Sequence, residues 1–149
     1  MLQWLKENVV KARETLTNEV AKFKNKTFME AIANACALIA TADGEVTSAE
    51  KMKMAGFINN SPELKAFNLT DVIKVFNDAC SKFEFDFHVG QAEALKNINR
   101  IKGKDAESRL LVRVACAIGA SDGNFDDKEK AACRMISLEL GLNPADFDL

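Results

Sequence analysis

Apolar side chains recur at steps of three and four residues along most of the chain, which is the spacing of one helix face. The stretch 2–24 shows this pattern first, at Leu2, Leu5, Val9, Ala12, Leu16, Val20 and Phe23. The pattern predicts one amphipathic helix there. The same spacing predicts further helices at about residues 28–42, 48–58, 69–83, 88–101, 106–120 and 127–140, with short turns after Pro62 and Pro144.

Two of these helices, 28–42 and 106–120, are apolar nearly all round, which predicts that both are central and buried. Thr27 precedes the first of them, and Glu30 follows three residues later, a spacing that predicts a capping box. Residues 83–89 alternate between apolar and polar positions, but a single strand has no partner for its backbone groups. We therefore expect a helix–helix junction with buried phenylalanines at that place.

The pattern as a whole predicts an all-α fold, with a single compact domain of about seven helices plus short turns. We expect an N-terminal amphipathic basic helix over residues 1–26 and the main helical domain over residues 27–149. A helix–Asp-Gly–helix unit occurs twice in that domain. The repeat predicts two pseudo-symmetric halves, about 27–84 and 85–149.

The two Asp-Gly turns carry the candidate chemistry. The copies align as Asp43, Gly44, Val46 and Glu50 in the first, and Asp122, Gly123, Phe125 and Glu129 in the second. An EF-hand calcium loop has a carboxylate, a glycine and a bidentate glutamate at the same spacing. Its first two ligand positions would be Ile39 and Thr41 in one copy and Ile118 and Ala120 in the other. Half of the ligands are therefore missing, and one loop alone would bind calcium only weakly.

Helix capping explains most of the same residues. In each copy the glycine stands where a helix ends and a left-handed residue is favoured. Thr47 and Asp126 each lie three residues before the glutamate, as the first residue of a capping box does. Neither role requires Asp43 or Asp122. If the halves bring the loops together, we expect one acidic surface that attracts cations or basic partners, formed by Asp43, Glu45, Asp122, Asp126 and Asp127.

Charge is nearly balanced over the whole chain, with 20 Lys and Arg against 22 Asp and Glu, so nothing favours nucleic acid as a partner. The N-terminal residues 1–26 are basic, whereas the C-terminal stretch is the most acidic part of the chain. The N-terminal helix could bind an anionic membrane or a partner protein through Trp4, Lys6, Lys11 and Arg13. Glutamates interleave these lysines, which favours the alternative of a helix docked on its own domain.

The sequence lacks the characteristic residues of the common enzyme classes. The sequence has no Gly-rich phosphate loop, no nucleophile elbow and no Ser/His/Asp set, so we expect no enzymatic activity. The four cysteines, Cys36, Cys80, Cys116 and Cys133, lie far apart on helical stripes, which predicts buried, reduced thiols in a cytoplasmic protein. His88 has no second metal ligand beside it. No apolar run is long enough to cross a bilayer.

Several motifs together resemble the bacterial tellurite-resistance protein B (TerB) family. They are Asn25-Lys26-x-Phe28-Met29-Glu30-Ala31, the Ala-Asp-Gly and Ser-Asp-Gly turns, Phe83-Glu84-Phe85-Asp86, the run from Ser121 to Lys130, and Leu140-Gly141-Leu142-x-Pro144. The resemblance extends nearly end to end. It implies an all-helical, pseudo-symmetric domain from tellurium- and general stress-resistance operons. It also implies an acidic face proposed to bind metal, and association with an integral-membrane protein of the same system.

These observations predict a non-enzymatic stress-resistance protein that binds a divalent cation (calcium, magnesium or zinc) weakly. The expected ligands are Asp43, Glu50, Asp122, Asp126, Asp127 and Glu129. The resemblance also carries Glu30, but that residue lies about 20 Å from Asp43 along one helix, which favours a capping role. The expected location is cytoplasmic, with assembly at the inner face of the inner membrane together with other stress-operon proteins. The alternative is a pure protein-interaction scaffold without a metal.

Overall fold

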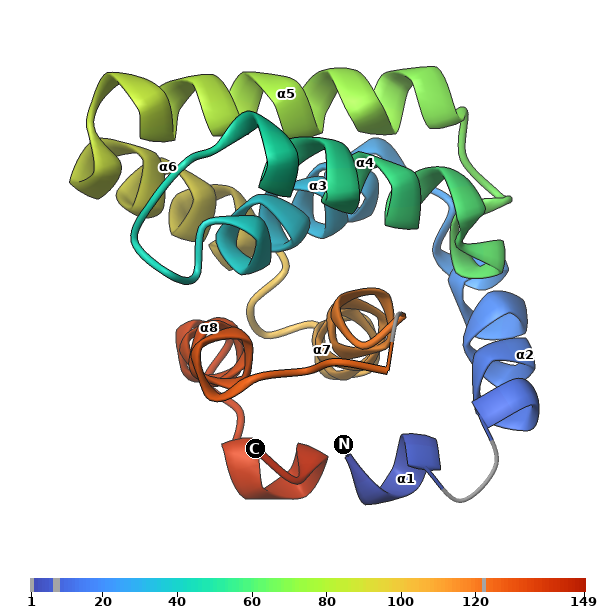
Figure 1. The fold of residues 1–149 in the computed structure, drawn as a ribbon. Coiled ribbons are helices and arrows are strands. Elements are labelled where there is room, and N and C mark those ends of the chain that lie inside the picture. The colour runs from blue at the N-terminus through green and yellow to red at the C-terminus, as the bar shows by residue number, and fades with distance from the viewer. Residues whose placement is uncertain (1, 7–8, 122) are drawn as a thin grey trace.

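The computed structural model describes residues 2–6, 9–121 and 123–149, with the side chain of Lys6 left out (Figure 1). In this part of the chain the all-α prediction is confirmed for a single domain, with eight α-helices instead of about seven and no strand. The α-helices are α1 Gln3–Lys6, α2 Val9–Val20, α3 Lys26–Ala40, α4 Ser48–Asn60, α5 Leu69–Phe85, α6 Phe87–Asn99, α7 Asp105–Gly119 and α8 Asp127–Glu139. Three 3₁₀ turns are η1 Ala21–Phe23, η2 Pro62–Leu64 and η3 Pro144–Phe147.

Helix α3 is the centre of the fold, as its apolar sequence predicts. All but one of its residues between Phe28 and Ile39 are buried, and the helix packs against α4, α5, α6, α7 and α8. In Figure 1, α5 lies above it, α4 crosses in front of it, and α7 and α8 lie below it. Burying one large aliphatic or aromatic side chain contributes about 1.5–3 kcal/mol. The enclosure of α3 is therefore a large part of what stabilises the fold. The second apolar helix, α7, is buried along most of its length too.

The N-terminal region differs from the single helix expected over 2–24. It forms α1, α2 and η1, and α1 and α2 run in different directions (Figure 1). Leu5 is buried on α1 and Leu16 on α2, but Val9, between them in the same sequence stripe, is 41% exposed. Apolar spacing locates buried side chains. It does not show where a chain changes direction.

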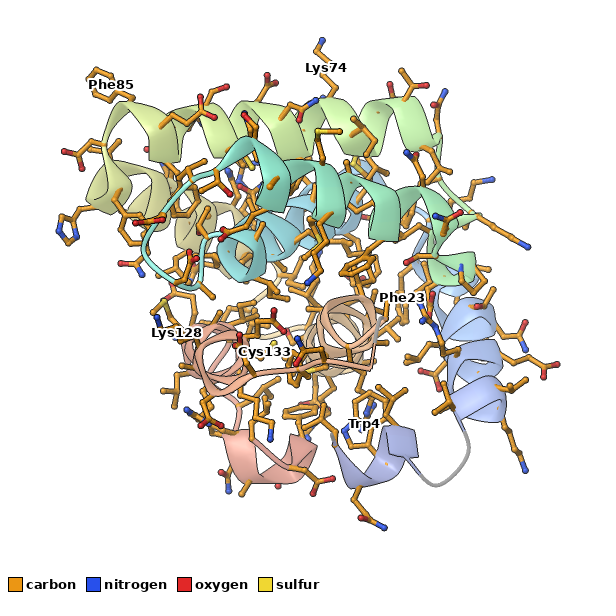
Figure 2. The ribbon with its side chains drawn as sticks, in the orientation of Figure 1. Trp4, Phe23, Lys74, Phe85, Lys128 and Cys133 are labelled. Carbon is orange, nitrogen blue, oxygen red and sulfur yellow. The ribbon has the colours of Figure 1, made fainter. Side chains whose placement is uncertain are left out.

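Helix α1 packs beside the C-terminus (Figure 2). The indole Nε1 of Trp4 donates to the carbonyl of Phe147 at 3.3 Å, and the backbone N of Gln3 donates to Asp148 Oδ2 at 3.0 Å. Trp4 also packs against the hydrophobic core. The two ends of the chain therefore close one end of the domain together.

The start of α3 corrects the expected capping box at Thr27 and Glu30. Asn25 is the N-cap, and its Oδ1 accepts from the backbone N of Phe28 at 2.8 Å. Thr27 lies inside the helix, and the carboxylate of Glu30 pairs with Lys26 at 3.8 Å and Arg100 at 3.4 Å. Asparagine is among the best N-cap residues, and in this sequence it stands two positions ahead of the threonine that the motif favoured.

The junction expected at residues 83–89 is confirmed, with one difference. Asp86 separates α5 from α6: its backbone N donates to Lys82 at 3.1 Å, and its Oδ1 accepts from Val89 N at 3.0 Å. Phe83 is buried and stacks edge-on with the half-buried Phe87. Phe85, expected to be buried, is 84% exposed and points away from the fold (Figure 2). The contact between Phe83 and Phe87 crosses the junction itself, and Phe85 takes no part in it.

Gly90 lets α6 cross α5 closely. A Cβ built at Gly90 would lie 2.5 Å from both the Cα and the backbone N of Phe83. Any side chain at this position would push the two helices apart. The crossing therefore requires glycine for lack of space, not for its backbone flexibility.

We predict that Gly90→Ala lowers the free energy of unfolding by about 1–3 kcal/mol, because the methyl group overpacks a backbone contact. Urea unfolding followed by circular dichroism measures the change. Gly56→Ala is the matched control: it lies inside α4, and an added Cβ meets no atom within 4 Å. The control should raise stability by about 0.5–1 kcal/mol. Equal effects of the two substitutions would contradict the close crossing.

Candidate functional site

The first Asp-Gly turn connects α3 to α4. Gly44 has φ of +89° and donates its N–H to the carbonyl of Thr41 at 3.0 Å. Thr47 caps α4, since its Oγ1 accepts from the backbone N of Glu50 at 3.1 Å. The capping interpretation of the glycine and the threonine is thereby confirmed. Asp43 Oδ1 accepts from the backbone N of Glu45 at 3.1 Å, so this aspartate also stabilises its own turn.

The second turn connects α7 to α8 and has the same backbone character. Gly123 has φ of +78° and donates to the carbonyl of Ala120 at 2.9 Å. Asp126 caps α8, with its Oδ1 accepting from Glu129 N at 2.8 Å. The predicted ligand Asp122 lies outside the described residues. The shared backbone features agree with a repeat, but the pseudo-two-fold relation of the two halves stays a prediction.

Residues from both turns and from the helices that follow them line one pocket of about 180 Å³. Each copy of the unit contributes two carboxylates: Asp43 and Glu50 from the first, and Asp126 and Glu129 from the second. Its apolar lining is Ile39, Met54, Phe57 and Gly119, and its cationic lining is Lys53 and Lys128. We refer to it as the inter-turn pocket. Four of the six ligands predicted from the sequence therefore line one pocket.

Asp43 and Glu50 form a coupled pair of carboxyl groups. Burial, and after it a hydrogen bond with Asp43, together raise the pKa of Glu50 to about 7. The same hydrogen bond lowers the pKa of Asp43. Below about pH 7, one proton therefore lies between the two groups, on Glu50. Oε2 of Glu50 is enclosed, and no hydrogen-bond donor in the described part of the chain reaches it.

The pocket is not a ready-made metal cage. Within residues 2–6, 9–121 and 123–149, no three His, Cys, Asp or Glu side chains stand close enough together to hold a metal ion. Two other predicted residues, Glu45 and Asp127, are exposed and do not line the pocket. A cation in the pocket would therefore need water ligands as well as these carboxylates.

Sequence reasoning missed the two lysines of the inter-turn pocket. Lys53 lies one turn after Glu50 on α4, on the same side as Met54 and Phe57. That helical spacing is the signal that would have found it. Lys128 lies in the first turn of α8 and is exposed. Both lysines offset part of the negative charge of the four carboxylates.

A buried ion pair, also missed, holds the N-terminal helix to the domain. Arg13 on α2 contacts both carboxylate oxygens of Glu63, at 2.6 and 2.9 Å, and the Glu63 side chain is fully buried. Arg13 Nη1 also donates to Ser121 Oγ at 3.4 Å, next to the second turn. The side chains of Arg13 and Trp4, predicted to bind a partner, are thus engaged inside the fold. Lys11 is exposed.

The four cysteines are free and buried, as predicted. Burial raises the pKa of the Cys36 thiol to about 12 and that of Cys80 to about 11. A hydrogen bond with Cys116 and burial raise the pKa of Cys133, which lies inside the fold between α7 and α8 (Figure 2). His88 is exposed on α6, close to the junction. Among the described residues no helix has both the length and the apolar character needed to cross a membrane.

The sequence is similar to known proteins over the residues that form this site. The family model of tellurite resistance protein TerB matches residues 29–149, which include all four carboxylates of the inter-turn pocket. The chain is also similar to a tellurium resistance protein TerB from an Alcaligenes species. The two are 40% identical over 110 residues, covering 74% of this chain and 90% of that protein. No solved structure matches the chain.

We predict that stability falls as the pH rises from about 4.5 to about 7, because the folded state holds the Glu50 proton more tightly than the unfolded state. The stabilisation is complete below pH 4.5 and is lost as the pH passes the folded value. The pKa of Asp43 is lowered, so this residue changes the pH dependence of stability only below its ordinary value of 3.8, outside this window. Urea unfolding at several pH values should show a flatter profile for Glu50→Gln. Parallel profiles would contradict the proton assignment.

We also predict slow alkylation of the folded protein by iodoacetamide. The thiolate fraction falls tenfold for each unit of pKa, so Cys36 should react about 10³-fold more slowly than an ordinary thiol, even before access is considered. Mass spectrometry of labelled peptides measures each site. Unfolding in urea should make all four sites react. Fast labelling of any one in the folded state would show that its thiol is accessible.

Proposed function

The chain belongs to the tellurite resistance protein TerB family, and from this premise we propose that it serves in tellurium resistance by binding a divalent cation weakly, without catalysing a reaction. The observation that supports this is the inter-turn pocket, which is lined by Asp43 and Glu50 from one copy and by Asp126 and Glu129 from the other. Neither turn has enough ligands alone. Together they supply four carboxylates to one small volume.

The donors in the pocket favour a hard cation. All four candidate ligands are carboxylates, which suit calcium and magnesium, whereas zinc prefers thiolate and imidazole ligands. The thiols are buried and free, and His88 does not line the pocket. Calcium accepts six to eight oxygens, and magnesium keeps several of its waters. Either ion could combine these carboxylates with water.

Two features limit the affinity. Lys53 and Lys128 place positive charge in the same pocket. Glu50 must also lose its proton before it can bind a cation, so binding releases a proton and weakens as the pH falls. Against these costs, a cation would neutralise the enclosed Oε2 of Glu50, which no donor of the described residues reaches. We therefore expect weak, pH-dependent binding.

We also propose that the protein supports a complex at the inner face of the inner membrane with the membrane protein of the resistance system. On α2 the exposed side chains of Val9, Val10 and Lys11 combine apolar and basic character, which suits an anionic membrane surface or a partner beside it. A scaffold without a metal is the alternative. In that case the pocket carboxylates bind a basic surface, and partner capture survives chelation of divalent cations.

Titration of the ¹⁵N-labelled protein with calcium, magnesium or zinc tests the cation proposal. We predict that calcium or magnesium at up to millimolar concentration shifts amide signals in residues 43–50 and 123–129. The double variant Asp43→Asn and Asp126→Asn should lose the shifts. Asparagine can keep both side-chain acceptor bonds of these positions while removing two charges.

The matched control is Asp71→Asn with Asp78→Asn, which removes the same charge from α5, where neither aspartate lines the inter-turn pocket. It should titrate like the unaltered protein. Equal loss in both variants would show only a general effect of net charge. Unshifted signals in both turns at millimolar cation would exclude the metal function and leave the scaffold.

A further inference from the structure

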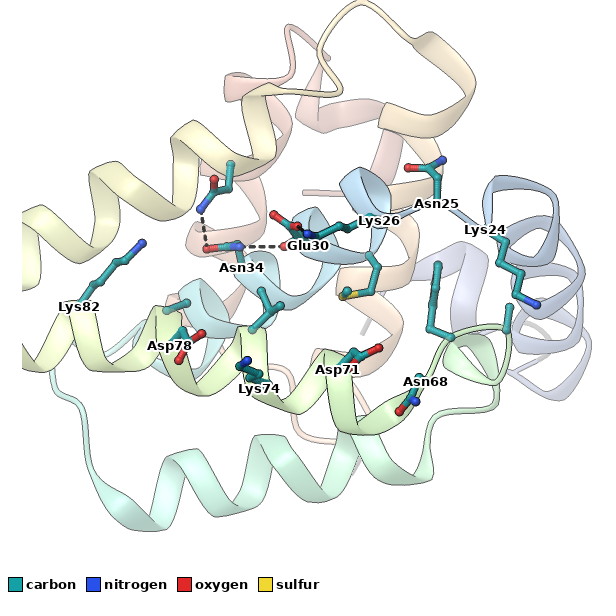
Figure 3. A pocket seen from close by; sticks show the side chains of 16 residues that line it. Lys24, Asn25, Lys26, Glu30, Asn34, Asn68, Asp71, Lys74, Asp78 and Lys82 are labelled. Atoms are coloured by element: carbon teal, nitrogen blue, oxygen red, sulfur yellow. Dashed lines mark hydrogen bonds and ion pairs between the residues drawn. The ribbon is translucent and has the colours of Figure 1, made fainter.

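A second cavity lies elsewhere, in a groove between α3 and α5 (Figure 3). Its volume is about 820 Å³, and it shares no lining residue with the inter-turn pocket. Helix α6 contributes Asn97, and the segment before α5 contributes Ala66, Phe67 and Asn68. We refer to it as the α3–α5 groove.

The groove has an apolar floor with amide groups. Met29 and Ala79 are buried there, and Phe67 and Val75 are half-buried. Asn34, only 3% exposed, is the one amide among the buried residues of α3. Burying an amide in a helix core lowers the free energy of unfolding unless its hydrogen bonds are made. The position of Asn34 at the groove floor therefore points to a functional role.

The amide pair has hydrogen-bonding capacity to spare. Asn34 Nδ2 donates to the carbonyl of Glu30 at 2.8 Å, and its Oδ1 accepts from Asn97 Nδ2 at 3.4 Å (Figure 3). A side-chain amide has two N–H donors and an oxygen with two lone pairs. The pair can therefore both donate to and accept from a further group in the groove. A peptide group offers this combination of acceptor and donor.

Charges of alternating sign follow the α5 rim of the groove. They are Asp71, Lys74, Asp78 and Lys82, in that order along the helix. Lys82 pairs with Glu93 at 3.8 Å, whereas the first three form no ion pair within the described part of the chain. In Figure 3 all four are drawn along the length of α5 that borders the groove. Their spacing of three to four residues is about 5–6 Å along a helix.

The charges that line the groove favour some classes of ligand over others. Lysines also come from the other side, at Lys24 and Lys26, and Glu30 lies beside them, so neither sign dominates the groove. A nucleic acid or a free phosphate would meet aspartates, and a metal ion would meet lysines. A polypeptide in extended conformation matches better. Its side chains on one face repeat about every 6.7 Å, close to the charge spacing of the rim.

We propose that the α3–α5 groove binds an extended segment of a partner protein, with its backbone at the Asn34–Asn97 pair and charges of alternating sign facing α5. The rim from Asn68 to Lys82 is about 21 Å long, the length of about six extended residues. Apolar side chains at alternate positions face Met29, Phe67 and Val75. Basic and acidic side chains at the other positions face Asp71, Lys74 and Asp78.

The charge order gives a sharp test with synthetic peptides. The complement of Asp71, Lys74 and Asp78 is positive, negative, positive, which reads the same in both chain directions. The probe is the acetylated, amidated pentapeptide Lys-Val-Glu-Val-Lys, and the charge-reversed pentapeptide Glu-Val-Lys-Val-Glu is its control. We predict that the probe binds with a dissociation constant near or below about 1 mM and shifts the side-chain amide signals of Asn34 and Asn97. The control should bind roughly five- to tenfold more weakly.

Two variants decide whether the groove is responsible. The triple variant Asp71→Lys, Lys74→Glu and Asp78→Lys should invert the preference between the peptides. Glu14→Lys changes the net charge by the same amount at an exposed position of α2 outside the groove, and should leave the preference unchanged. Asn34→Leu should weaken both peptides while the protein stays folded, since it replaces a buried amide with an apolar side chain of similar size.

Several results would overturn the proposal. They are shifts outside the groove, equal affinity for both peptides, an uninverted preference in the triple variant, and binding too weak to detect at several times about 1 mM. Groove signals that move with protein concentration alone would show that a second copy of the chain occupies the groove instead. Circular dichroism of each variant confirms that the helices are intact.

Discussion

The burial of α3 is the constraint on which the rest of the structure depends. A helix that is apolar nearly all round is stable only if other helices cover it on every side, and α4 to α8 do so here. This enclosure leaves the end of α3 beside the end of α7, where Ile39 lies within 3.4 Å of the Cβ position at Gly119. The turn after α3 and the turn after α7 therefore both border the inter-turn pocket. The inter-turn pocket follows from the packing of the core.

The pocket shows how capping residues can acquire a second role. Asp126 and Thr47 start α8 and α4, and each accepts a hydrogen bond from the backbone N of the glutamate three residues later. The carboxyl of Glu50 then hydrogen-bonds with Asp43, and burial together with this bond raises its pKa to about 7. A site built from helix ends is as rigid as the helices that carry it. The buried ion pair of Arg13 with Glu63 links α2 to η2, and Arg13 also donates a hydrogen bond to Ser121, the residue before the second turn.

Apolar spacing predicted most helices, because α3 to α8 each bury a continuous stripe or their whole circumference. It failed at the N-terminus, where one apolar stripe is divided between two helices, α1 and α2, that run in different directions. It also failed at Phe85, which was expected to be buried at the junction but is exposed. The repeat pointed to Asp43, Glu50, Asp126 and Glu129. Lys53 was missed although its helical spacing from Glu50 points to it. Lys128 and the pair of Arg13 with Glu63 escaped prediction, because each depends on contacts between segments far apart in the sequence.

The central claim is that enclosing α3 makes one cation pocket from two distant turns. Paramagnetic Mn²⁺, a hard cation that carboxylates bind, tests it most directly, because it broadens the amide signals nearest to it. The account predicts that signals from residues 43–50 and 123–129 lose intensity together, with a single midpoint, and that α5 signals around Asp71 and Asp78 stay sharp. Broadening confined to one turn, or spread evenly over all exposed carboxylates, would contradict it.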